Sequence, residues 1–118
     1  MIADDQTSPA AETESRSREA LERLLASGHD NAVLRFSLGN AYLSADGRRA
    51  IEHLERAIEF NPAYSAAWKL LAKALVNAGE NDQARATYVR GIAVAEANGD
   101  LQAAKEMRVF LRRLTTKL

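Results

Sequence analysis

Cysteine is absent from the 118-residue sequence, and proline and aromatic residues are few. Without cysteine the chain forms no disulfide, carries no catalytic thiol and offers no thiolate to a metal. The formal net charge is zero, so the basic excess that phosphate binding requires is missing, and we expect no nucleic-acid partner. No hydrophobic run approaches the roughly 18 residues of a membrane span, so we expect no membrane association.

Hydrophobic residues make up 47% of the chain and charged residues 27%, with alanine and leucine prominent. This mix is typical of thin helical layers, and the length suits one domain. The first residues, MIADDQTSPA, are acidic and lack the apolar segment of a secretory signal, so we expect a cytoplasmic protein. Residues 1–15 have little to bury and are predicted to form a disordered acidic tail, or alternatively an arm that folds over a basic groove.

One pattern occurs twice, at an offset of 33 residues in its first half and 34 in its second. In each copy, small residues occur at matching positions of the two expected helices, beside large apolar residues. Two helices can approach closely only where such small residues face each other. Because one copy cannot bury its apolar face alone, the copies are expected to stack. The first copy contains Leu38, Gly39, Tyr42, Ala50, Leu54 and Ala57, and the second contains Leu71, Ala72, Leu75, Ala84, Tyr88 and Gly91.

This pattern resembles the tetratricopeptide repeat, a helix-turn-helix unit of about 34 residues. Trp68-x-x-Leu71-Ala72, followed by Ala84-x-x-x-Tyr88, carries the resemblance in the second copy. The first copy has Arg35 in place of the tryptophan. The match covers residues 32–98, and the layout is similar to that of small stand-alone bacterial members. The resemblance implies an all-α, right-handed α-solenoid of about two repeats.

The expected organisation is a single domain over residues 16–118, with a capping helix at each end. The predicted segments are cap helix 17–27, repeat one 32–62, repeat two 65–98 and cap helix 101–115, and the repeat helices are 32–44, 48–60, 64–78 and 81–97. Gly28, Gly79 and the Asn61-Pro62 pair mark helix ends. The apolar stripe of the last helix consists of Leu101, Ala104, Met107, Leu111 and Leu114.

No arrangement of residues indicates catalysis or metal binding. His29 lies in a predicted turn, and His53 lies on a helix beside Glu52 and Glu55, which indicates a solvated face. No zinc motif, nucleotide-binding loop or nucleophile elbow is present. We therefore predict that the protein is not an enzyme and binds no cofactor or metal.

In tetratricopeptide proteins the first helix of each repeat lines a concave groove that commonly binds a peptide. The resemblance implies that the groove is lined by Val33, Phe36, Asn40, Leu43, Lys69, Lys73, Val76 and Asn77. Lys69 and Lys73 are four residues apart and share one helical face. With Asn40 they would hold a carboxylate or an acidic peptide, and Phe36 would hold an apolar side chain. Alternatively, the two lysines only keep this face soluble.

The predicted function is a protein–protein interaction module, an adaptor or scaffold whose partner is an unidentified protein or peptide, acidic if the lysines bind it. The carboxylate clamp of some family members is not predicted, because Phe36 stands where its basic residue would be. The alternative is a structural module that self-associates weakly, through a cap or through Val109 and Phe110. Contact of these two residues with helix 81–97 is the simpler interpretation.

Overall fold

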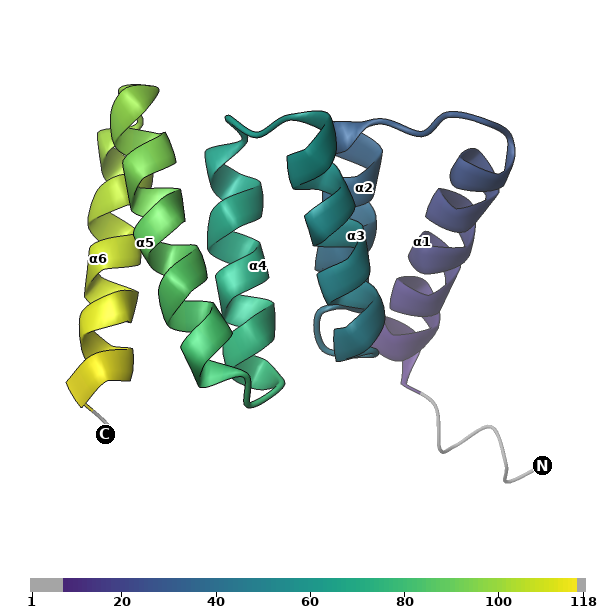
Figure 1. Ribbon diagram of the computed structural model, residues 1–118. Helices are drawn as coiled ribbons and strands as arrows, with labels where there is room; N and C mark the ends of the chain where they lie inside the picture. The colour runs from purple at the N-terminus through teal and green to yellow at the C-terminus, as the bar shows by residue number, and fades with distance from the viewer. Residues whose placement is uncertain (1–7, 117–118) are drawn as a thin grey trace.

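A computed structural model describes residues 8–116, which form six helices packed in chain order (Figure 1). Each helix contacts the next, and α4 also contacts α2 and α6. The helices α2, α4 and α6 therefore form one layer, which we call the inner layer, and α3 and α5 form the outer layer. The helices are α1 (Pro9–Ala26), α2 (Ala32–Tyr42), α3 (Gly47–Phe60), α4 (Ser65–Asn77), α5 (Asn81–Ala97) and α6 (Leu101–Thr116).

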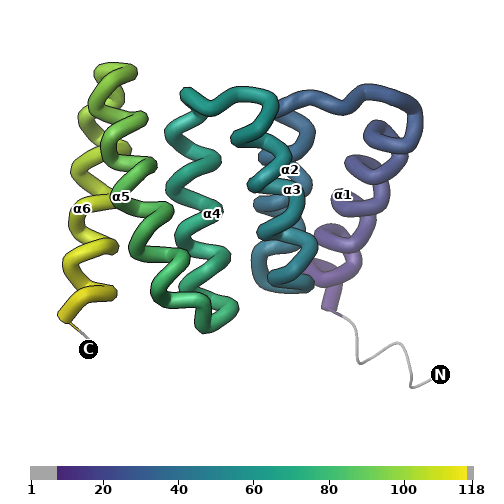
Figure 2. Tube along the Cα trace, in the orientation of Figure 1, coloured from purple at the N-terminus to yellow at the C-terminus, as the bar shows by residue number. Residues whose placement is uncertain are grey.

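The predicted α-solenoid is confirmed by this arrangement, with α1 and α6 at opposite ends of the stack (Figure 2). None of the helices within residues 8–116 is long and apolar enough to cross a membrane. Cap residues set several helix starts. The Asn31 side chain accepts a hydrogen bond from the Leu34 N–H at 2.9 Å, and the Asp46 side chain accepts one from the Arg49 N–H at 3.2 Å.

Three turns contain a glycine in the left-handed region, and the first of these is Gly28 after α1. Gly79 ends α4 with φ of +81°, and Gly99 ends α5 with φ of +75°. A side chain at either position would strain the backbone, so glycine stops the helix there at little cost.

The first helix begins earlier than the sequence pattern predicted. Residues 9–15 were expected to be disordered, but α1 starts at Pro9 and is continuous to Ala26. The reason is a local start signal: Ser8 caps the Ala11 N–H at 3.1 Å, and Pro9 occupies the first helical position. Residues 1–7, the rest of the predicted tail, lie outside the described part of the chain.

Small residues hold the layers together, as the repeat pattern predicted. A Cβ atom added at Gly39 would overlap the Leu54 side chain, and one at Gly91 would lie 2.7 Å from the Met107 sulfur. Leu54 and Met107 are fully buried. The close approach of α2 to α3, and of α5 to α6, therefore requires glycine at these two positions.

Trp68 anchors the second repeat. Its side chain is 6% exposed, and its indole N–H donates to the Pro62 carbonyl at 2.8 Å. The Arg90 guanidinium lies 5.0 Å from the ring centroid and covers one face of the indole. Trp68 thus connects the end of the first repeat to both helices of the second.

Polar contacts attach α1 to the first repeat. The helix has no buried residue, although Leu21 and Leu25 pack against the core. The Tyr42 hydroxyl donates to the Glu22 carboxylate at 2.6 Å and accepts from Arg49 at 3.2 Å. The bond to Glu22 also raises the pKa of Tyr42. We call this cluster of Glu22, Tyr42 and Arg49 the Tyr42 network.

Candidate functional site

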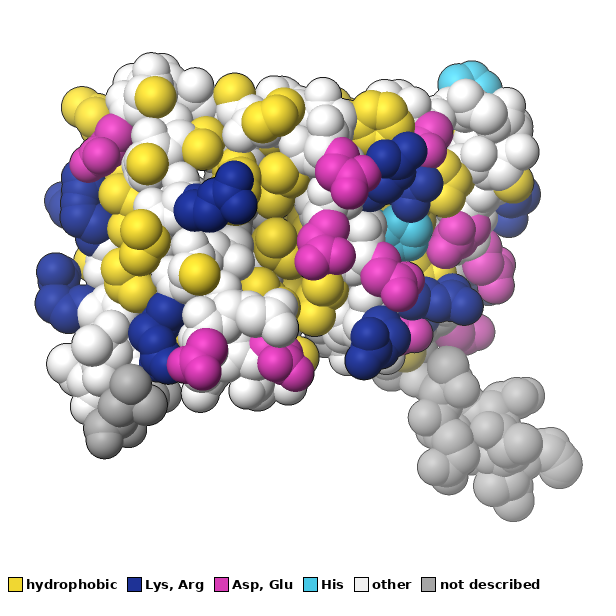
Figure 3. All heavy atoms as spheres, in the orientation of Figure 1, with side chains coloured by type: hydrophobic (Ala, Val, Ile, Leu, Met, Phe, Trp, Pro, Cys, Tyr) yellow, Lys and Arg dark blue, Asp and Glu magenta, His cyan; other side chains and the backbone are white. Residues whose placement is uncertain are grey.

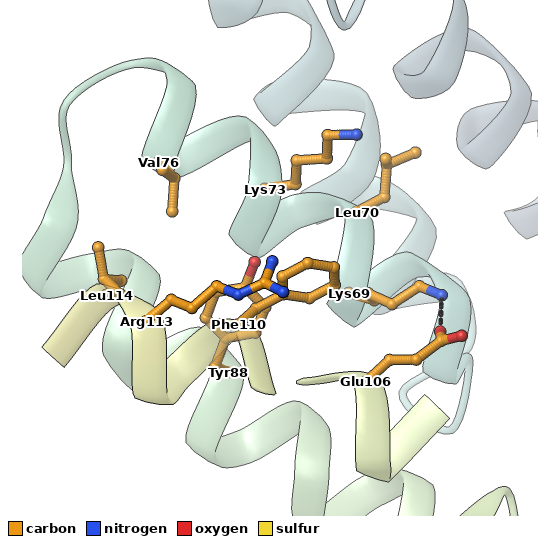
Figure 4. A pocket seen from close by; sticks show the side chains of 9 residues that line it. All are labelled: Lys69, Leu70, Lys73, Val76, Tyr88, Glu106, Phe110, Arg113 and Leu114. Atoms are coloured by element: carbon orange, nitrogen blue, oxygen red, sulfur yellow. Dashed lines mark hydrogen bonds and ion pairs between the residues drawn. The ribbon is translucent and has the colours of Figure 1, made fainter. Parts of the chain in front are cut away.

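A cavity of about 540 Å³ lies between α4 and α6, with α5 at its base (Figure 4). We call it the α4–α6 cavity. Its lining residues are Lys69, Leu70, Lys73, Val76, Tyr88, Glu106, Phe110, Arg113 and Leu114. The cavity thus combines an apolar interior with charged side chains from two inner helices.

Aromatic and aliphatic side chains form the interior of the α4–α6 cavity. Phe110 stacks on Tyr88 with ring centroids 6.1 Å apart and an interplanar angle of 29°. Tyr88 is buried, and this burial raises the pKa of its hydroxyl. Phe110 remains 39% exposed, so its free surface faces the cavity. A ligand with a large apolar side chain would find a preformed surface here.

The charged groups around the cavity are not equivalent. The Lys69 ammonium lies 2.5 Å from the Glu106 carboxylate, which also accepts a hydrogen bond from Gln102 at 3.0 Å. The hydrogen bond from Lys69 is the main reason why the pKa of Glu106 is lowered. The charge of Lys69 is therefore already compensated by a neighbouring helix.

Lys73 and Arg113 are the basic side chains of the lining that have no acidic partner within residues 8–116. Lys73 is exposed and makes no ion pair with any of residues 8–116. Arg113 lies across Phe110, with its guanidinium 5.8 Å from the ring centroid (Figure 4). Three basic side chains and one acidic side chain line this cavity, in a chain whose formal net charge is zero.

The predicted groove residues are only partly brought together. Lys69, Lys73 and Val76 line the α4–α6 cavity. Phe36 and Asn40 instead line a second cavity of about 480 Å³ between α1 and α2. The two sets of residues therefore belong to different cavities, although both lie on inner-layer helices.

The other predicted groove residues are less available to a ligand in either cavity. Val33 is 66% exposed and Asn77 is also exposed, but neither lines one of these two cavities. Leu43 packs against the core. The Phe36 ring already stacks on the Tyr64 ring, with the two ring centroids 5.1 Å apart. An apolar ligand group at Phe36 would have to compete with that contact.

The sequence pattern did not indicate Glu106, Phe110 and Arg113 as site residues. They are spaced at i, i+4 and i+7 and so share one face of α6. The predicted contact of Phe110 with helix 81–97 is present, through Tyr88, but Phe110 also faces the cavity. The helical spacing was the available signal, and it was obscured because α6 lacks the repeat motif.

His53 is not on a solvated face as predicted. It is 8% exposed, stacks on Tyr42 with centroids 5.7 Å apart, and its Nδ1 lies 3.1 Å from an Arg35 nitrogen. Burial, followed by the charge of Arg35, lowers the pKa of His53. The ring therefore serves as a neutral packing partner. Within residues 8–116, no cluster of histidine and carboxylate side chains is suited to hold a metal ion.

A family model for the tetratricopeptide repeat matches residues 41–107, more than half of the sequence. The chain belongs to the tetratricopeptide repeat family. Members of this family are generally protein-interaction modules and typically non-catalytic. Protein partners are thus implied in general, in keeping with a cavity that has apolar and charged parts.

Related proteins extend this result. The TPR repeat-containing protein PA0015 of Pseudomonas aeruginosa is 56% identical over 97 residues, which cover 81% of this chain and 92% of that protein. The solution structure of protein BPP2914 from Bordetella parapertussis is 44% identical, with a TM-score of 0.76, and the match covers 85% of this chain and 88% of that one. A crystal structure of MamA, at 24% identity and a TM-score of 0.67, shares the fold over 87% of this chain and 59% of its own.

Proposed function

We propose that this tetratricopeptide protein is an adaptor that binds an extended protein segment in the α4–α6 cavity. The segment places an apolar side chain against Phe110 and an acidic group between Lys73 and Arg113. The observation that carries this proposal is the lining itself: two basic side chains without an acidic partner in the cavity lie beside an exposed aromatic ring.

The chemistry of the cavity favours an acidic ligand over a basic one. Glu106 is the acidic residue in the lining, and its carboxylate already accepts hydrogen bonds from Lys69 and Gln102. A basic ligand would meet Lys73 and Arg113 without compensation. A carboxylate near these two residues gains charge-assisted hydrogen bonds, and arginine can hold it in a bidentate geometry.

The experiment is fluorescence anisotropy with a labelled synthetic peptide of alternating leucine and aspartate, compared with the same peptide carrying lysine for aspartate. We expect the wild-type protein to bind the acidic peptide, with an affinity that falls as salt is added. The double substitution Lys73→Glu with Arg113→Glu is expected to remove that binding. Lys69 is left unchanged because its substitution would also break its ion pair with Glu106.

The matched control is Arg16→Glu with Arg23→Glu, which makes the same charge change on exposed residues of α1 outside the cavity. This control should bind the acidic peptide with an affinity close to that of the wild type. Equal binding of both peptides, or equal loss in both variants, would refute a specific site in the α4–α6 cavity.

A further inference from the structure

The outer-layer helix α3 carries a row of acidic side chains. Glu52, Glu55 and Glu59 are spaced at i, i+3 and i+7, and all three are exposed. Figure 3 shows acidic side chains over α3 on this face, beside a band of hydrophobic atoms toward α5. We call these three residues the acidic row.

The acidic row is incompletely neutralised. Glu59 pairs with Arg56 at 2.5 Å, but Glu52 and Glu55 make no ion pair with any of residues 8–116. The pKa of Glu55 is raised, first by burial and then by the charges of Glu59 and Glu52. An additional cation placed along this row would relieve the repulsion between the carboxylates.

The helix α6 carries the opposite charge at the same spacing. Lys105, Arg108 and Arg112 stand at i, i+3 and i+7, and all are exposed. Arg108 pairs with Glu96 at 3.0 Å, whereas Lys105 and Arg112 have no acidic partner within the described chain. Basic side chains appear at the left edge of Figure 3, where α6 lies. We call these three residues the basic row.

The two rows cannot pair within one molecule. The helix α6 contacts α5 and α4, whereas α3 contacts α2 and α4, and no contact joins α3 to α6. No helix of residues 8–116 covers the basic row. A second copy of the chain can bring the missing partner to each row.

We propose that copies of this protein associate by docking α6 of one copy antiparallel against α3 of another, with the basic row along the acidic row. The pairs are Lys105 with Glu59, Arg108 with Glu55 and Arg112 with Glu52. Each row spans seven residues, or about 10 Å, so the spacings match to within one residue along the helix. Three ion pairs in register fix the direction of α6 relative to α3, which a single ion pair could not do.

Apolar side chains favour the antiparallel direction. Phe60 is 44% exposed and directly follows the acidic row, and Leu101 is 69% exposed and lies one turn before the basic row. When the helices run in opposite directions, these two side chains lie at the same end of the contact. One helix against one helix is a small interface, so the association is weak and depends on protein concentration.

The test is sedimentation equilibrium of the full chain over a range of concentrations, at low and high salt. The first variant, Glu52→Lys with Glu55→Lys and Glu59→Lys, reverses the acidic row. The second variant, Lys105→Glu with Arg108→Glu and Arg112→Glu, reverses the basic row. The matched control makes the same charge change as the first variant on exposed residues of α1, through Glu12→Lys, Glu14→Lys and Glu19→Lys. Circular dichroism establishes that each variant is folded.

We expect the wild type and the α1 control to associate at low salt and to dissociate when salt is added. Each row variant alone should be monomeric, with a dissociation constant raised at least ~tenfold. An equimolar mixture of the two row variants should associate again, because each supplies the charge that the other lost. A wild type that stays monomeric, row variants that associate as the wild type does, or a mixture that stays monomeric would overturn the proposal.

Cross-linking tests the direction of the helices, and the absence of native cysteine makes it specific. A mixture of Glu59→Cys and Lys105→Cys proteins should give a heterodimer with a short bismaleimide. A mixture of Glu59→Cys and Arg112→Cys proteins should give little. A reversed preference would overturn the antiparallel arrangement.

Discussion

The two terminal helices are attached to the solenoid by different chemistry. The helix α1 has no buried residue and is held by two half-buried leucines and the Tyr42 network. The helix α6 buries four residues, including Met107, which is 0% exposed. The helix α1 is thus attached at its edge, whereas α6 continues the inner layer and completes a cavity with α4. A helix outside the repeat pattern can therefore still line a cavity of the solenoid.

The largest difference between the ends should appear when one apolar side chain is truncated in each. Met107→Ala leaves a cavity against Gly91 and is expected to reduce the free energy of unfolding by about 2–5 kcal/mol. Leu25→Ala removes a half-buried side chain and should cost about 1 kcal/mol. Urea denaturation of both variants measures the difference. Equal losses would show that the two helices are attached equally strongly.

The next largest loss of stability is expected at the α1 end, when the Tyr42 network is broken. Tyr42→Phe removes the hydroxyl that bridges Glu22 and Arg49, and we expect a loss of about 1 kcal/mol. Amide hydrogen exchange in α1 should become faster while exchange in α6 is unchanged. Tyr64→Phe is the control, because its hydroxyl makes no hydrogen bond with any of residues 8–116. Uniform acceleration across the chain would contradict a local attachment.

Mild acid should lower the free energy of unfolding through His53, which packs on Tyr42. The pKa of His53 is lowered by burial and by Arg35, so the unfolded chain binds a proton more readily than the folded chain. Stability is therefore complete above the ordinary histidine pKa of about 6.5 and falls as the pH drops from there toward the folded value. Thermal unfolding at several pH values between neutral and mildly acidic measures how steeply the stability changes with pH. His53→Gln should make this pH dependence less steep. An unchanged pH dependence would assign the effect to carboxylates.

The smallest effect on stability is expected at the α6 end, from the ion pair between Lys69 and Glu106. Both side chains are partly exposed, and such pairs contribute little. Glu106→Gln should therefore leave the melting temperature unchanged. The same substitution frees Lys69 and should strengthen binding of the acidic leucine–aspartate peptide. A clear loss of stability would show that this ion pair holds α6 in place.

Much of the fold was predictable because short-range signals define it. The matched small residues, Gly39 and Gly91 among them, indicated the layers, and Gly79 and Gly99 indicated the turns. The helix predicted over residues 81–97 has the same bounds as α5. Such features depend on a residue and its near neighbours in the chain. They can therefore be recognised in a single sequence.

The site was harder to predict because it depends on contacts between distant residues. Lys69 and Glu106 are 37 positions apart, so no local pattern shows that one neutralises the other. Leu101 was predicted to face inward, yet it is 69% exposed, and Ala103 is buried instead. Small residues carry little pattern signal, and the inner stripe of α6 was therefore placed incorrectly at its start.

The position of Trp68 also makes the second repeat observable by itself. It is the only tryptophan in the sequence, it is buried, and a guanidinium covers its ring. Its intrinsic fluorescence therefore reports the packing of α4 and α5 without any label. Opening of α1 would leave the emission unchanged, and loss of the α4–α5 packing would shift it to the red.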